Sequence, residues 1–95
     1  MDTELIIIRE YIQQANIEPQ FIALLEENGL IHIQEMDNER YLPADELTEV
    51  ERYARLYYDL SINMEGIDAI HHLLDRIYAL QDEMRTLRNQ LRFLE

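Results

Sequence analysis

The sequence predicts a mainly α-helical protein with a small β-hairpin and a long C-terminal helix. The 95 residues include only 2 Gly and 2 Pro, which favours helices over a β-sandwich. The apolar content of 47% is enough for one hydrophobic core. From Ile70 onward, apolar residues recur in alternating steps of three and four, which is typical of a coiled-coil helix. We therefore expect a domain over residues 1–62 and a dimerisation helix over residues 63–95.

The first third of the chain predicts two short helices joined by a turn. The apolar run Leu5–Ile8 fits either a short strand or the start of a helix. Helical spacing continues over residues 11–15, and Asn16 is expected to end this helix. A second helix is expected to begin at Pro19, because proline suits the first helical turn. Gly29 is the expected residue just after its end.

A β-hairpin and a third helix are predicted next. Ile31 and Ile33 alternate with polar residues, and a polar turn leads into a return strand, so we expect a hairpin over residues 31–42. A third helix is expected over residues 44–60, after Pro43. Its predicted apolar face consists of Leu47, Val50, Ala54 and Tyr57.

The break between the third helix and the long helix contains residues suited to a cap and to close packing. Ser61 and Asn63 are both good helix N-caps. Gly66 has no side chain, so we expect it to allow close approach of the preceding helix.

The long helix carries an apolar seam at the a and d positions of four heptads. At about 1.5 Å per residue, residues 65–95 would span roughly 45 Å, more than the core of this domain needs. We therefore expect homodimerisation through this helix, with folding back onto its own domain as the alternative. Glu83 could pair with Arg88 in a parallel dimer or with Arg76 in an antiparallel one. The predicted seam is Ile70, Leu73, Ile77, Leu80, Met84, Leu87, Leu91 and Leu94.

The charge of the chain points away from nucleic acid. The net charge is −12, and residues 1–60 hold 14 acidic residues and 4 Arg, a local net charge of −10. Affinity for DNA comes largely from basic residues that neutralise phosphates, so this part would repel DNA. An acidic surface instead favours fast encounter with a basic partner, although it could also serve only solubility.

No residue pattern predicts an enzyme, a metal site or a cofactor. The chain has no Cys, which excludes disulfides and thiolate chemistry. His71 and His72 are adjacent and would point about 100° apart on a helix, and His32 adds no convincing metal spacing. Neighbouring carboxylates are expected by chance in so acidic a chain. Without a long apolar run or a basic N-terminal region, we expect a cytoplasmic protein.

The predicted order of helix, turn, helix, wing and long helix resembles the MerR-type winged helix–turn–helix regulators. In that family the second helix carries Arg near its start and the wing ends in a basic motif. Here the run Pro19–Glu27 has no basic residue, and the wing keeps only Arg40-Tyr41. The resemblance implies the fold, with a transcription regulator as one possible function, but the basic residues that contact phosphates are missing.

The second half of the chain is more similar to the chaperone-modulator, or CbpM-like, family. The similarity runs from Val50 and includes Arg52-x-x-Arg55-Leu56-x-x-Asp59-Leu60, then Ile62-Asn63, Gly66-Ile67 and Leu74-Asp75-x-Ile77. It continues through Leu80, Glu83 and Leu87-Arg88. It implies binding to the J domain of a DnaJ/CbpA-like co-chaperone and inhibition of its action on Hsp70.

The residues expected to contact such a partner are surface acids and two arginines. The arginines could orient the binding face, as the resemblance implies, or simply pair with Asp59 or Glu51 at helical spacing. A bare oligomerisation module remains a third hypothesis for the chain. The expected contact residues are Glu26, Glu27, Glu46, Glu49, Arg52 and Arg55.

Overall fold

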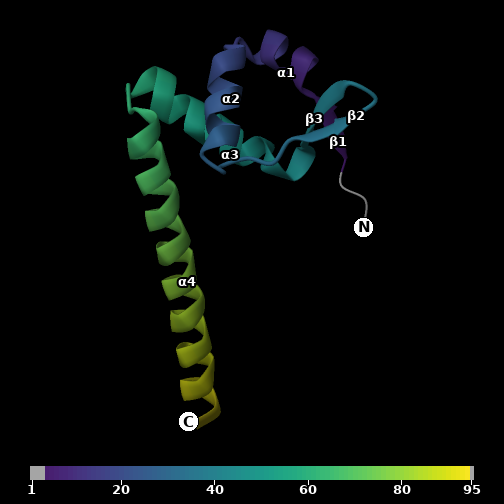
Figure 1. Ribbon diagram of the computed structural model, residues 1–95. Helices are drawn as coiled ribbons and strands as arrows, with labels where there is room; N and C mark the ends of the chain where they lie inside the picture. The colour runs from purple at the N-terminus through teal and green to yellow at the C-terminus, as the bar shows by residue number, and fades with distance from the viewer. Residues whose placement is uncertain (1–3, 95) are drawn as a thin grey trace.

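The computed structural model describes residues 4–94, in which a small head carries one long C-terminal helix (Figure 1). We call residues 4–63 the head. The long helix α4 (Met64–Leu94) leaves the head at one side and projects away from it (Figure 1). This mainly helical architecture, with a small antiparallel sheet, confirms the predicted fold class.

Helices α1 (Ile8–Ala15) and α2 (Pro19–Glu27) form the helix–turn–helix. Asn16 ends α1 in the left-handed conformation, with φ 56°. Gly29 has φ 71°, and its N–H donates to the carbonyl of Glu26 at 3.0 Å. The next N–H, that of Leu30, donates to the carbonyl of Leu25 at 2.9 Å, which completes a Schellman cap. The predicted end of α1 and both predicted ends of α2 are confirmed.

The sheet has three antiparallel strands in the order β1-β3-β2. Strand β1 (Leu5–Ile7) pairs with β3 (Glu39–Pro43), so the run left open in the sequence begins as a strand and continues as α1. Strand β2 (Gln34–Met36) also pairs with β3. Asp37 and Asn38 join β2 to β3 with φ values of 51° and 64°, as a type I′ turn requires.

The predicted first strand of the hairpin is too long by three residues. It begins at Gln34 rather than at Ile31. Ile31 is instead buried in the core of the head, and Ile33 packs at its edge. The packing of these two side chains against the core keeps residues 31–33 out of the sheet.

The third helix has the predicted extent but three different hydrogen-bonding patterns. A 3-10 turn, η1 (Ala44–Glu46), leads into α3 (Leu47–Ala54), and a π-helical segment, η2 (Arg55–Asp59), ends it. The wider π turn sets both Tyr57 and Tyr58 against Phe21, with ring centroids 4.9 Å and 5.4 Å away.

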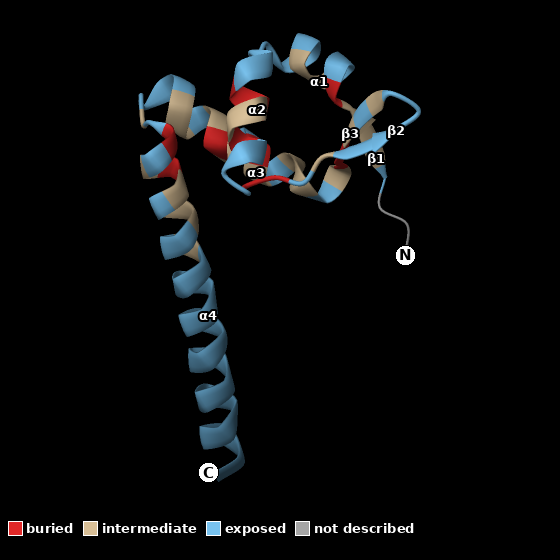
Figure 2. Ribbon diagram, viewed as in Figure 1, coloured by how far each residue is buried: buried red, intermediate tan, exposed pale blue. Residues whose placement is uncertain are grey.

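The core of the head draws on its helices, the sheet and the first turns of α4 (Figure 2). Val50 is fully buried as predicted, but so is Tyr53, which was missing from the predicted face. Tyr53 lies three residues after Val50 and four before Tyr57, so helical spacing places it on the same face, whereas the contact of its hydroxyl with His71 on α4 depends on the tertiary fold. The buried apolar residues are Ile8, Ile17, Phe21, Ile22, Leu25, Leu30, Ile31, Leu42, Val50, Tyr53, Met64 and Ile67.

Asn63, rather than Ser61, caps the long helix. Its Oδ1 accepts the N–H of Gly66 at 2.9 Å. A Cβ on Gly66 would lie 2.7 Å from Ile62 Cγ2 and 3.1 Å from Asn63 Oδ1. The close approach predicted at Gly66 is therefore to the capping loop and not to the preceding helix.

Beyond its first turns, α4 does not touch the head. We call residues 75–94 the stalk, and each of them is exposed (Figure 2). The radius of gyration is 17.2 Å, against about 12 Å for a compact chain of this length. The alternative in which the helix folds back onto its own domain is wrong. The predicted last helical residue, Glu95, lies outside the described residues. None of the helices in residues 4–94 is long and apolar enough to cross a membrane.

Candidate partner-binding surface and helical seam

The arginines of the head are mostly neutralised by glutamates of the head. Arg9 on α1 lies 3.1 Å from Glu39 on β3, and this hydrogen bond raises the pKa of Arg9 above its usual value. Arg40 on β3 lies 2.7 Å from Glu26 at the end of α2. The second helix and the wing, which are the elements that would face DNA, therefore offer little unpaired positive charge.

The structure ties several of the expected contact residues into pairs within the chain. Glu46 accepts the backbone N–H of His32 at 3.2 Å and lies 2.8 Å from His32 Nδ1. Arg52 pairs with Glu49 at 3.3 Å, and not with either acid named as its alternative partner. The spacing explains this, because residues three apart share a helix face, whereas Glu51 lies about 100° around α3 from Arg52.

The six expected contact residues come from four different elements. Glu26 and Glu27 end α2, Glu46 ends η1, and Arg55 begins η2. Glu49 and Arg52 lie on α3. Nothing in the structure gathers all six around one site.

A solvent-open cavity of about 500 Å³, lined by both polar and apolar side chains, lies between the end of α1 and the α3–η2 segment. Arg55 lines it, and Glu51 and Asp59 flank Arg55 one helical turn away on each side. Burial, and then the charge of Glu51, raises the pKa of Tyr11 at this cavity, so its hydroxyl stays neutral. Among the described residues Arg55 forms no ion pair. The lining residues are Tyr11, Ala15, Asn16, Ile17, Glu51, Ala54, Arg55, Tyr58 and Asp59.

The cavity offers charges of both signs and tyrosine hydroxyls. Such a surface fits charged side chains of a protein partner. The sequence-based expectation included Arg55 but not Glu51 and Asp59, which line the same cavity. The available signal was their spacing of four residues on either side of Arg55, which was read only as internal pairing.

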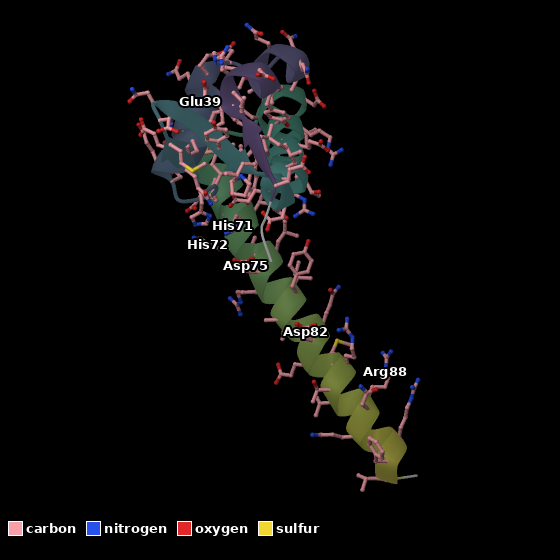
Figure 3. The ribbon with its side chains drawn as sticks, turned by 90° about the vertical axis from the view of Figure 1, so that its right-hand side faces the viewer. Glu39, His71, His72, Asp75, Asp82 and Arg88 are labelled. Atoms are coloured by element: carbon pink, nitrogen blue, oxygen red, sulfur yellow. The ribbon has the colours of Figure 1, made fainter. Side chains whose placement is uncertain are left out.

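The predicted seam is exposed along the stalk. Ile70 is partly buried, while the other seven seam residues have exposed fractions from 46% at Ile77 to 82% at Leu94. On the stalk itself, Asp82 lies 3.3 Å from Arg85 within the same helix, and Arg88 lies nearly two turns beyond Asp82 (Figure 3). A continuous apolar row of this length is unusual on a monomeric surface.

Two histidines lie where α4 leaves the head, and each faces an aspartate. His71 Nε2 lies 3.4 Å from Asp75, and His72 Nε2 lies 3.5 Å from Asp68. The other ring nitrogen of His71 lies 2.8 Å from the hydroxyl of the buried Tyr53. The histidines show no metal-ligand spacing among themselves, but these carboxylates lie one helical turn away and could have been found from the sequence.

The helix–turn–helix, the three-stranded sheet and the long free helix define a winged helix–turn–helix protein. Residues 6–89 match the family model of the MerR HTH family regulatory protein, and the chain belongs to that family. This membership places it among regulatory proteins. No curated protein and no solved structure matches the chain.

Proposed function

We propose that the protein is a non-enzymatic, cytoplasmic modulator that binds the J domain of a DnaJ/CbpA-like co-chaperone. In this role it inhibits the stimulation of Hsp70 by that co-chaperone. The proposal rests on the similarity to CbpM-like proteins from Val50 onward. One structural observation supports it above others: glutamates of the head pair with three of its four arginines, Arg9, Arg40 and Arg52. In this family fold the second helix has no basic residue, and Arg40 of the wing is paired with Glu26, so the elements that would face DNA offer little unpaired positive charge.

Electrostatics favours a basic protein partner. Residues 1–60 carry a net charge of −10, and J domains present a basic helix to Hsp70. Complementary charge speeds the encounter of two proteins and makes it sensitive to salt. An acidic head that occupies this basic helix would keep Hsp70 from reaching it.

The cavity beside Arg55 is the proposed centre of the contact surface. Glu51 and Asp59 provide carboxylates for basic side chains of the partner, and Arg55 can bind a carboxylate of the partner. Glu27 is exposed at the end of α2 and can extend the acidic surface. Four of the expected contact residues already have partners within the head, namely Glu26, Glu46, Glu49 and Arg52. They would contribute to the electrostatic field around the surface and not to new ion pairs with the partner.

A homodimer through the stalk is part of the proposal. Burying the seam against a second copy removes the apolar side chains of both stalks from water. Parallel and antiparallel arrangements both remain open, because Glu83 can pair with Arg88 in one and with Arg76 in the other.

The test is a calorimetric titration of the full chain with the isolated J domain of a DnaJ-like protein from the same genome. It is run at low and at moderate salt, with duplex DNA as a parallel titrant. We expect binding of the J domain that weakens with salt, and no heat with DNA. The absence of any binding heat with the J domain would overturn the proposal.

A matched pair of charge reversals locates the surface. Glu51→Lys changes the cavity, whereas Glu35→Lys makes the same change of charge on β2. We expect Glu51→Lys to slow association with the J domain about tenfold, and Glu35→Lys to have a smaller effect. Equal effects of the two variants would show that net charge alone acts and would remove the cavity from the contact surface.

The second candidate function is a DNA-binding regulator, which membership of the MerR family favours. Salt-dependent binding of duplex DNA with no response to the J domain would support it. A chain that dimerises but binds neither titrant would instead be an oligomerisation module.

A further inference from the structure

We propose that Asp75, His71 and His72 form a binding site for a divalent transition-metal ion of the zinc class. The site lies on α4, where the helix leaves the head (Figure 3). One ligand atom from each of these three residues lies within 4.8 Å of those from the other two. This inference is independent of the proposed partner, because it uses none of the residues around the cavity.

The spacing of the ligand atoms fits a metal better than a hydrogen bond. Zinc holds imidazole nitrogen and carboxylate oxygen at about 2.1 Å, so two ligands of a tetrahedral ion lie about 3.3 Å apart. The distance from His71 Nε2 to Asp75 is 3.4 Å, which is close to this ligand spacing and exceeds the usual N–H···O range of about 2.7–3.2 Å. His72 Nε2 lies 3.5 Å from Asp68, which is not one of the three ligands, so this distance does not describe the proposed site. His72 and Asp75 are mostly exposed, so small rotations can close the remaining gap.

Tyr53 sets the orientation of His71. The Tyr53 side chain is fully buried, and its hydroxyl lies 2.8 Å from His71 Nδ1. When Nδ1 carries the ring proton, it donates to the Tyr53 hydroxyl and leaves the lone pair of Nε2 for a metal. Histidine ligands of metals are commonly held through their second nitrogen in this way.

The site stays accessible in a dimer formed through the seam. With Ile70 at position a, His71 and His72 occupy positions b and c, and Asp68 and Asp75 occupy position f. These positions form the outer face of a coiled coil. Two imidazoles with a carboxylate favour Zn²⁺, Ni²⁺ or Cu²⁺ over Mg²⁺, which prefers oxygen ligands alone. The net charge of −12 attracts any of these ions.

The test is a calorimetric titration of the full chain with ZnCl₂ in a buffer that does not bind metal, repeated with MgCl₂. We expect one zinc ion per chain and no comparable response to magnesium. His72→Ala and Asp75→Asn should each weaken zinc binding at least about tenfold. His32→Ala is the matched control, because His32 also lies beside a carboxylate, that of Glu46, but outside the site. Asp68→Asn shows whether a second carboxylate joins the ligands.

Thermal unfolding with and without zinc provides a second measurement. A ligand that binds the folded chain raises its melting temperature, and this rise should vanish in His72→Ala. Circular dichroism of that variant without zinc should match the wild type, because the His72 side chain is mostly exposed. The proposal is overturned if zinc does not bind, if His72→Ala and Asp75→Asn bind zinc as the wild type does, or if His32→Ala loses binding equally.

Discussion

The head buries its apolar side chains, whereas the stalk leaves its apolar side chains exposed to solvent. Ten apolar residues of the head are buried, packed together with Met64 and Ile67 from the first turns of α4, and Leu25 has no exposed surface. On the stalk, six apolar residues at heptad spacing face solvent, including Leu87 with 55% of its surface exposed. Both regions use the same helical periodicity. Periodicity therefore marks a helix face to be buried, whereas the fold decides whether the chain itself can cover that face.

The largest expected effect is on the free energy of unfolding, and it differs between the head and the stalk. Leu25→Ala should lower the free energy of unfolding by about 3–5 kcal/mol, because it leaves a cavity in the core. Leu87→Ala should change it by less than about 0.5 kcal/mol, because in a single chain this side chain is already in water. Urea unfolding at a dilution where the chain is monomeric measures both. A large loss in Leu87→Ala under that condition would show that the stalk packs onto its own head.

The next effect concerns association of the stalk. Leu80→Glu places a carboxylate in the middle of the seam, where a dimer would bury it, so we expect self-association to weaken about a hundredfold or more. Ala79→Glu adds the same charge at the neighbouring position outside the seam and should leave association nearly unchanged. Sedimentation equilibrium gives both constants.

Removal of residues 82–95 provides a coarser version of the same experiment. This truncation deletes half of the seam and should abolish dimerisation while the head remains folded. A truncated chain that stays dimeric would contradict dimerisation through the seam, and so would a wild-type chain that is monomeric.

The smallest effect concerns the contact between the head and α4. Burial, followed by the charge of Glu49, raises the pKa of Tyr53 to about 12. The unfolded chain ionises Tyr53 near pH 10, so its contribution to stability is complete below pH 10 and is lost as the pH rises toward 12. Each pH unit in this window should cost roughly 1.4 kcal/mol.

Tyr53→Phe should remove this loss of stability at alkaline pH. Tyr78→Phe is the control, because Tyr78 is exposed on the stalk. Urea unfolding between pH 8 and pH 11.5 makes the comparison. If Tyr53→Phe and the wild type lose stability in parallel, ionisation of Tyr53 does not govern the alkaline limit of the head.

Most of the fold could be predicted because its signals are local. Asn16, Pro19 and Gly29 mark helix ends through their own backbone preferences, and the alternation of apolar residues marks α4. Strand β1 could not be assigned in advance, because a three-residue strand exists only through its pairing with β3. The start of β2 was misplaced because Ile31 is buried in the core of the head, and this burial outweighs its strand-like alternation with polar neighbours.

The candidate sites were less predictable than the fold. Arg55 was found through the family resemblance, but the cavity around it forms only when the end of α1 meets α3 and η2. The pairs Arg9–Glu39 and Arg40–Glu26 join residues far apart in the chain, so the sequence showed an excess of acid without showing which arginines it cancels.

The helical class, the acidic charge and the apolar row of the long helix follow from the sequence, because composition and periodicity are properties of neighbouring residues. Which of these features meet in space depends on the fold. The tertiary structure sets Tyr53 against His71, brings the end of α1 beside Arg55 and leaves the seam uncovered along the stalk. The physical reason is that such contacts depend on how distant segments pack, and packing is decided by the whole core together.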